Sequence, residues 1–165
     1  MISFTPIHEE QFESFFTKTL NHFIEDLQIC ESISLKEAKT KALSQLSTVL
    51  PDGMKSTGHL FFHIVDETQK VVGYFWLLIK EEKKEAFVFD VMIHPDQRGK
   101  GYGKAAMMLG EEIARENGAE KIWLHVIAQN TVALALYRKL GYKIFRTYPM
   151  KNGPDVASYN MTKNL

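Results

Sequence analysis

A glycine-rich turn between a strand and a helix constrains this chain more than any other feature. The turn is Arg98-Gly99-Lys100-Gly101-Tyr102-Gly103; the apolar run Val91 to Ile93 precedes it, and a helical pattern starts at Tyr102. Glycine lets the backbone turn without Cβ clashes and approach a ligand closely. The first amides of the following helix have no partner within it, and the helix dipole adds about half a positive charge there. The segment therefore predicts a phosphate-binding turn.

Two common phosphate-binding turns do not fit this spacing. A Walker P-loop needs a hydroxyl residue directly after its lysine, whereas Lys104 is followed by Ala105. A Rossmann turn needs its third glycine one residue later than Gly103 and follows an early strand. Glycines that only shape a tight turn are the simpler alternative. The alternation of glycines between two basic residues favours an anion-binding role instead.

The rest of the chain predicts a mixed α/β fold. Helical spacing of apolar residues and β-branched or aromatic runs place the elements as follows: helices over 8–27, 34–47, 102–116 and 130–140, and strands over 2–6, 59–65, 71–80, 86–93, 121–127, 142–148 and 157–161. The strands between 59 and 93 are expected to form antiparallel hairpins. No repeat, linker or low-complexity tract interrupts the order, so residues 1–165 are expected to form a single domain.

Two of the helices carry detailed expectations. Ser34 and Glu37 form a capping box at the start of the second helix. The buried stripe of that helix is predicted at Leu35, Ala38, Ala42, Leu43 and Leu46. The inward side chains of the helix after the glycine turn are predicted to be Ala105, Ala106, Leu109 and Ile113.

Composition excludes several classes of function. Twenty basic and twenty acidic side chains give a net charge of +0, so nothing indicates a nucleic-acid partner. Cys30 is the only cysteine, which favours a reducing compartment, and the N-terminus does not resemble a signal peptide, so the cytoplasm is expected. The longest apolar run, Val71 to Ile79, is shorter than the ~20 residues of a membrane span. The histidines lack zinc-type spacing, and no metal is expected.

The glycine turn resembles the acetyl-CoA motif of the GNAT superfamily, Gln/Arg-x-x-Gly-x-Gly/Ala. The resemblance extends to Ile93-His94-Pro95 before the turn and to a later pattern at Asn130, Ala133, Leu136-Tyr137 and Gly141-Tyr142. These matches cover roughly residues 86 to 145. The resemblance implies the GNAT fold, which has a central, mostly antiparallel twisted sheet of about seven strands flanked by about four helices.

The resemblance also implies which residues bind acetyl-CoA. In relatives the turn amides hold the pyrophosphate of coenzyme A, which corresponds here to Arg98, Gly99, Lys100, Gly101, Tyr102, Gly103 and Lys104. The preceding strand, Val91, Met92 and Ile93, would present backbone groups to the pantetheine arm as an added strand would. A bulge in that strand would leave an N–H free to stabilise the thioester oxyanion.

Asn130 and Tyr137 lie two turns apart on one face of the predicted helix over 130–140. In relatives an amide at the position of Asn130 contacts the pantetheine; a helix cap is its structural alternative, and both roles can coexist. The tyrosine at the position of Tyr137 protonates the departing thiolate in many relatives. The ordinary pKa of a phenol, about 10, is close to that of an alkyl thiol, about 8.5, so proton transfer to the thiolate is reasonable. Tyr137 could also be a core aromatic.

Three residues are candidates for the base that deprotonates the acceptor amine, which has an ordinary pKa of about 10.4. His125 comes first, because relatives that acetylate ribosomal-protein alanine carry a glutamate base there. Asp90 is second; it matches an acidic position of relatives and alternates with Phe89 and Val91, so it is expected to face away from both. Glu85 is third and is expected to share its face with Phe87, Phe89, Val91 and Ile93.

The resemblance implies an acetyl-CoA-dependent N-acetyltransferase in which a primary amine attacks the thioester directly within a ternary complex. The acceptor is either a small-molecule amine or a protein N-terminus or lysine. A non-catalytic acyl-CoA sensor is the alternative from another class of function, and Asn130 and Tyr137 argue against it. Dimers are common among relatives, so a homodimer is expected on that ground alone.

Overall fold

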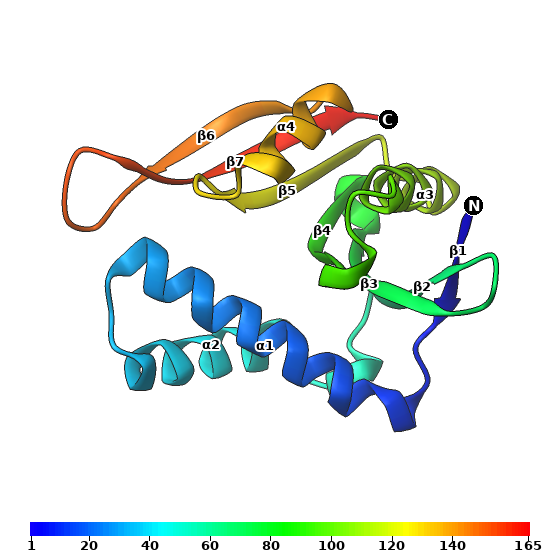
Figure 1. The fold of residues 1–165 in the computed structure, drawn as a ribbon, viewed down its shortest axis with the longest axis horizontal. Helices are drawn as coiled ribbons and strands as arrows, with labels where there is room; N and C mark the ends of the chain where they lie inside the picture. Colours follow the sequence, from blue (N-terminus) through cyan, green and yellow to red (C-terminus); the bar gives the residue numbers. More distant parts are fainter.

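The computed structural model describes residues 1–165 and arranges them as one seven-stranded sheet with four α-helices (Figure 1). In chain order the elements are β1 (Ile2–Pro6), α1 (Glu9–Glu31), α2 (Leu35–Val49), β2 (His59–Asp66), β3 (Val71–Lys80), β4 (Glu85–Ile93), α3 (Tyr102–Glu116), β5 (Lys121–Ile127), α4 (Thr131–Lys139), β6 (Lys143–Pro149) and β7 (Val156–Asn164). The predicted mixed α/β fold is confirmed, and every predicted helix and strand is present. No helix combines the length and apolarity that crossing a bilayer requires.

Parallel pairing occurs at a single place in the sheet. The strand order is β1-β2-β3-β4-β5-β7-β6, and all neighbours are antiparallel except β4 and β5. That pair runs only from Glu85 opposite Lys121 to Val88 opposite Leu124. β4 continues to Ile93 and β5 to Ile127 without pairing to each other. The two strands therefore diverge in the middle of the sheet.

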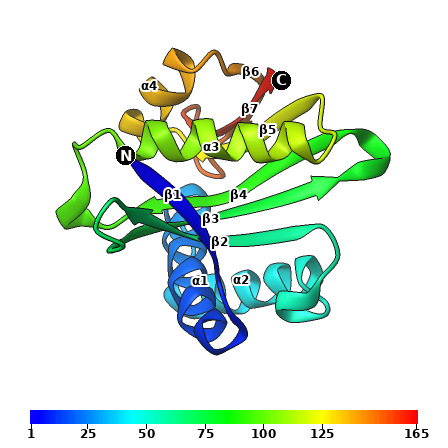
Figure 2. The ribbon, with the colours of Figure 1, turned by 90° about the vertical axis from the view of Figure 1, so that its right-hand side faces the viewer.

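Helices cover both faces of the sheet, and each face has its own hydrophobic core. Figure 2 shows α1 and α2 on one face and α3 on the other. The core on the side of α3 contains the buried side chains of Leu77, Ala106 and Met107. The core beneath α1 is aromatic: Phe15 meets Tyr74 edge-on with ring centroids 5.2 Å apart. Aromatic pairs of this kind add stability beyond the area they bury.

A bulge in β4 changes which way its side chains face. Trp76 of β3 pairs with Asp90, but the next residue, Leu77, pairs with Val88, so Phe89 is an extra residue. Phe89 stacks on Trp76 on the α1 side, with ring centroids 4.4 Å apart. Asp90 hydrogen-bonds Tyr74 on the same side.

The bulge overturns two predictions about β4. Asp90 does not face away from Phe89, and Glu85 does not share one face with all of the odd-numbered residues to Ile93, because alternation breaks at the extra residue. Val91 and Ile93 pack against the opposite core from Phe89. The bulge also lies at Phe89, upstream of the Val91 to Ile93 segment where it was expected.

The buried faces of α2 and α3 differ from the faces predicted for them. The capping box of Ser34 and Glu37 is confirmed, but Leu35 and Leu43 are 50% and 46% exposed. The buried stripe of α2 is therefore narrower than predicted and consists of three residues spaced four apart, Ala38, Ala42 and Leu46. In α3 the most buried residues are Ala106, Met107, Gly110, Glu111 and Ala114, so the helix is rotated from the expected orientation.

Gly110 brings α3 close to the sheet, and a larger residue there is expected to be costly. A Cβ built on Gly110 would overlap the ring of Phe75, which is fully buried. Gly110→Ala is therefore expected to lower the free energy of unfolding by about 2 kcal/mol, despite the higher helix propensity of alanine. Urea denaturation measures the change. Met108→Ala, at a site 52% exposed on the same helix, is the control and should stay within about 0.5 kcal/mol of the wild type; equal stability of both variants would contradict the packing.

Candidate functional site

The glycine turn presents the N-terminus of α3 to an open space. Gly99 and Gly101 have φ angles of +77° and +80°, a region that favours glycine. Nothing lies within 4 Å of a Cβ built on either residue, so the space beside them is not filled by the protein. Gly101 is the N-cap, so the amides of Tyr102, Gly103 and Lys104 have no partner within the helix. The turn thus has the geometry of an anion-binding site.

A cavity of about 620 Å³ begins at this turn. It is lined by residues of α1, β4, the turn, α3 and α4: His22, Glu25, Asp26, Asp90, Val91, Met92, Ile93, Gln97, Arg98, Gly99, Gly101, Tyr102, Gly103, Lys104, Met107, Asn130, Val132, Ala133, Leu136 and Tyr137. We refer to it as the turn cavity. It includes every residue predicted to bind the coenzyme except Lys100, whose Nζ donates a hydrogen bond to Gln97 Oε1 at 2.8 Å.

A second cavity of about 420 Å³ lies against the diverging ends of β4 and β5. Aromatic side chains contribute much of its wall: Phe23, Phe87, Phe89, Trp123 and Tyr148. His125 lines this cavity and not the other. We refer to it as the groove cavity. Its volume is in the range typical of small-molecule sites.

The two cavities share one set of lining residues, and this set defines their junction. It consists of His22, Asp26, Asp90, Val91, Asn130 and Tyr137. A ligand in the turn cavity and one in the groove cavity would therefore meet where β4 and β5 separate. Sequence reasoning found Asp90, Val91, Asn130 and Tyr137 but missed His22 and Asp26, which lie on α1.

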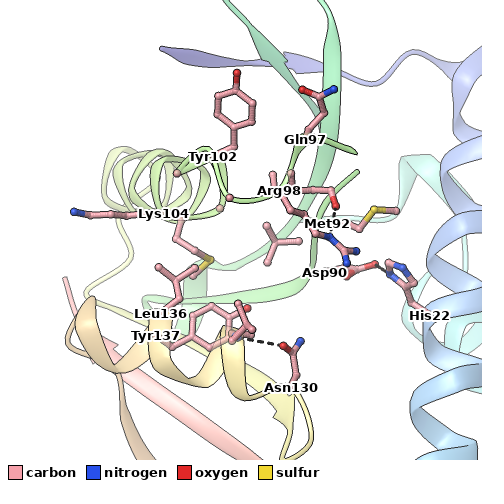
Figure 3. Close-up of a pocket in the computed structure, with 18 of the residues that line it drawn as sticks. His22, Asp90, Met92, Gln97, Arg98, Tyr102, Lys104, Asn130, Leu136 and Tyr137 are labelled. Carbon is pink, nitrogen blue, oxygen red and sulfur yellow. Dashed lines mark hydrogen bonds and ion pairs between the residues drawn. The ribbon is translucent and has the colours of Figure 1, made fainter. Parts of the chain in front are cut away.

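Tyr137 is buried at the junction, with 8% of its surface exposed. Burial, and after it the negative charge of Asp90, raise the pKa of its hydroxyl above the ordinary value. The phenol therefore keeps its proton at neutral pH and can donate it. Leu136, beside it in the chain, lines only the turn cavity; Figure 3 shows both side chains on α4.

Asn130 caps α4, which is one of the two roles predicted for it from the sequence. Its Oδ1 accepts a hydrogen bond from the Ala133 amide at 3.1 Å and caps α4. Because the cap uses the oxygen, the Nδ2 group remains available to donate to a ligand in either cavity. The cap also fixes the orientation of the side chain at the junction.

Asp90 belongs to a hydrogen-bonded chain that links β4, β3 and α1. The Tyr74 hydroxyl donates to Asp90 Oδ2 at 3.0 Å, so its oxygen accepts from His22 Nδ1, also at 3.0 Å. Nδ1 of His22 lies 3.5 Å from Asp90 Oδ2, and Figure 3 shows the two side chains meeting. Contact with Asp90 raises the pKa of His22, although burial opposes the shift.

Asp26 lies one helical turn after His22 and lines both cavities. Asp26 remains exposed to solvent, but partial desolvation by the cavity walls, and then the negative charge of Asp90, raise the pKa of its carboxyl group to about 6. A signal for both residues existed in the sequence. Thr19, His22 and Asp26 interrupt the apolar stripe of α1 with polar side chains at helical spacing, and Thr19 is fully buried.

His125 forms a polar group with two residues of β6 and β7. Asn160 Nδ2 donates to the Tyr148 hydroxyl at 3.0 Å, which leaves Asn160 Oδ1 to accept from His125 Nδ1 at 2.7 Å. In the neutral imidazole this arrangement places the proton on Nδ1 and leaves Nε2 as an acceptor. His125 is therefore held at the wall of the groove cavity and does not line the turn cavity.

Glu85 does not reach the site. It lies at the start of β4, where that strand still pairs with β5, and its Oε1 is 4.0 Å from Lys121 Nζ. It lines neither cavity. Its role as a base in the predicted site is thus not supported, because the site forms at the opposite end of the strand.

Comparison with known proteins relates this geometry to one family. The model of the acetyltransferase (GNAT) family matches residues 18–142. The uncharacterized N-acetyltransferase YdgE of Bacillus subtilis is 34% identical over 136 residues, which cover 81% of this chain and 87% of that protein. The family model begins within α1 and extends past α4, so it covers every residue that lines the turn cavity.

Solved structures share the fold. The crystal structure of the acetyltransferase YycN from Bacillus subtilis superposes with a TM-score of 0.86 at 28% identity, covering 94% of this chain and 100% of that one. The spermidine N-acetyltransferase of Vibrio cholerae, crystallised with CoA and spermine, superposes with a TM-score of 0.72 at 18% identity, covering 99% and 95%. At 18% identity, the likeness to the spermidine N-acetyltransferase concerns the fold alone.

The hydrogen-bonded chain predicts how His22 titrates. Asp90→Asn is expected to lower the pKa of His22, because the contact with Asp90 is the main cause of its raised value. The imidazole resonances of His22 should then titrate at lower pH in an NMR titration. Glu25→Gln serves as a comparison, since Glu25 contributes only a weaker charge effect, and should give a smaller shift. Equal shifts in the two variants would contradict the assigned contact.

Proposed function

The chain belongs to the GNAT acetyltransferase family, and we propose that it transfers the acetyl group of acetyl-CoA directly to a small primary amine bound in the groove cavity. Family membership establishes the coarser statement, that the chain is an acetyltransferase that uses acetyl-CoA and acts on an amine. The observation that carries the finer proposal is the meeting of two cavities at Tyr137. One cavity begins at an anion-binding turn and the other has an acidic inner end.

The turn cavity fits acetyl-CoA. The free amides of Tyr102, Gly103 and Lys104 would hold the pyrophosphate, with Arg98 and Lys104 adding positive charge at the cavity wall. Arg98 Nε donates to the Ile93 carbonyl at 3.1 Å, which ties this side chain to the end of β4. The open space beside Gly99 and Gly101 leaves room for the phosphates to approach the backbone.

The pantetheine arm would lie between the separated strands. β4 beyond Val88 has no pairing with β5, so the edge of this segment facing β5 is free to bond an extended ligand. Asn130 would donate from Nδ2 to an amide carbonyl of the arm. This placement brings the end of the arm to the junction, beside Tyr137.

Bound acetyl-CoA supplies a thioester carbonyl that an amine can attack and a thiolate that leaves. Tyr137 is proposed to donate its proton to the sulfur as the carbon–sulfur bond breaks. Its raised pKa keeps that proton in place until the thiolate forms. Because both substrates would be present at the junction together, no covalent acetyl-enzyme is required.

The groove cavity favours a small cationic amine with an apolar body. Asp26 and Asp90 lie at the inner end, where a protonated amino group would be attracted. Phe87, Phe89 and Trp123 line the groove further from the junction and suit an apolar or aromatic group. His125 is proposed to contact the acceptor through Nε2. A protein N-terminus or lysine is the alternative acceptor.

Coenzyme binding is expected to depend on free space beside Gly103. A Cβ there would lie 3.6 Å from Leu136 and 4.0 Å from Ile93, so a longer side chain would extend into the turn cavity between them. Gly103→Leu is expected to weaken acetyl-CoA binding at least about tenfold, measured by isothermal titration calorimetry. Met108→Leu, on the exposed side of the same helix, should bind as the wild type does, and circular dichroism checks that both variants fold. Unchanged affinity in Gly103→Leu would exclude this path for the coenzyme.

Tyr137→Phe is expected to lower turnover about 100-fold or more while leaving the affinity for acetyl-CoA within about threefold. Release of free thiol from acetyl-CoA measures turnover with phenethylamine, tyramine, spermidine, lysine and an alanine-terminated peptide as acceptors. Tyr142→Phe is the matched control, since Tyr142 is a buried tyrosine whose ring lies 5.9 Å from that of Tyr137 but which lines neither cavity. Coenzyme binding without thiol release for any acceptor would favour a non-catalytic sensor.

A further inference from the structure

The proposed reaction needs a group that removes a proton from the acceptor, because an alkylamine of pKa about 10 arrives as an ammonium ion. We propose that Asp26 on α1 accepts this proton, and that Asp90, fixed by Tyr74 and His22, keeps Asp26 available for the task. The inference rests on the proposed function and assigns a catalytic residue that is not among the three bases predicted from the sequence.

The position of Asp26 fits this role. It is one of the few residues that line both cavities, together with Tyr137, which is proposed to protonate the sulfur. Its carboxylate takes part in none of the ion pairs or side-chain hydrogen bonds of the structure, whereas Asp90 is bound by Tyr74 and lies beside His22. Asp26 can therefore bond an incoming ammonium group without breaking an existing contact.

The two carboxylates at the junction are in different environments, which divides the roles between them. Asp90 Oδ2 accepts the hydrogen bond of the Tyr74 hydroxyl, and the raised pKa of that hydroxyl keeps its proton in place. Asp90 thus remains a fixed acceptor. Partial desolvation, and then the negative charge of Asp90, raise the pKa of the solvent-exposed Asp26 to about 6, so Asp26 is ionised at neutral pH but is a stronger base than an ordinary carboxylate.

The other charged groups around Asp26 modify this balance without reversing it. On α1, His22 lowers the pKa of Asp26 and Glu25 raises it, and both effects are smaller than that of partial desolvation. Tyr137 on α4 is held in its neutral form by burial. His125 on β5 lines only the groove cavity, and Glu85 lines neither cavity, so neither of the other predicted bases has a place at the junction.

The ammonium group gives its first proton to the Asp26 carboxylate, and the freed lone pair forms the carbon–nitrogen bond as the carbon–sulfur bond breaks. Tyr137 gives its proton to the sulfur, and the second proton lost by nitrogen restores the Tyr137 hydroxyl. Asp26 then releases one proton to solvent. Acetylamide, free thiol and one proton are formed, as the overall reaction requires.

The pH dependence of kcat/KM tests the assignment with the panel amine that gives the highest rate. In the wild type, kcat/KM should rise through pH about 6, as Asp26 ionises, and then level off. Asp26→Asn should lose about 100-fold in kcat/KM at pH 7, with acetyl-CoA affinity retained. Its remaining activity should rise with pH up to the pKa of the amine, since only neutral amine can then react. Glu13→Gln, an acid of α1 outside both cavities, should behave as the wild type.

Asp90→Asn provides a second test, because the pH profile should shift in this variant only if the ionisation of Asp26 controls the rate. Removing the neighbouring negative charge should lower the pKa of Asp26 and move the acid limb of the wild-type profile to lower pH. A ¹³C NMR titration of the Asp26 carboxyl in the acetyl-CoA complex measures the same shift without any acceptor, and a value near 4 in the wild type would overturn the proposal.

Two results would separate this inference from the proposed function. If the wild type acetylates an amine and Asp26→Asn keeps its rate and its acid limb while His125→Gln loses them, the base is His125 and the inference fails alone. If the wild type binds acetyl-CoA but acetylates nothing, the proposed function fails. The inference then fails with it, whatever the carboxyl titration shows.

Discussion

The separation of β4 from β5 is the constraint on which the rest of this structure depends. These are the only parallel neighbours in the sheet, and their pairing ends at Val88 and Leu124. Backbone groups in the middle of a sheet normally bond the next strand. Where β4 and β5 part, that partner is missing on one side, and the two cavities meet there. The site is therefore a consequence of how two strands end their pairing, before any catalytic side chain is considered.

The bulge at Phe89 determines which side chains of β4 face this opening. Without the extra residue, alternation would direct Asp90 and Phe89 to opposite faces of the sheet. With it, both face α1, so Asp90 can meet Tyr74 and His22. Val91 and Ile93 then face α3 and the glycine turn. The one inserted residue thus separates the acidic and aromatic side chains of the groove cavity from the apolar side chains of the turn cavity.

Much of the fold could be predicted because its signals are local. Hydrophobic alternation placed the strands, Ser34 and Glu37 marked the start of α2, and the glycine spacing marked the start of α3. The errors have a common cause. Which side of α2 and α3 is buried depends on the surface against which each helix packs, so Leu35 and Leu43 are exposed despite their apolar character. The bulge could not be placed at Phe89 from the sequence either, because which residue is extra is defined by the pairing of β4 with β3.

The sequence by itself determined the elements, the anion-binding turn and the neighbourhood of Asn130 and Tyr137, since each is encoded within a short stretch of chain. The tertiary structure decided which acids lie beside Tyr137. It placed Glu85 at the paired end of β4 and His125 on the groove wall, and it brought His22 and Asp26 from a helix more than a hundred residues earlier in the chain than Tyr137. The physical reason is that the charges acting on a carboxyl group are set by distances across the fold, and these distances follow from packing that no local pattern specifies.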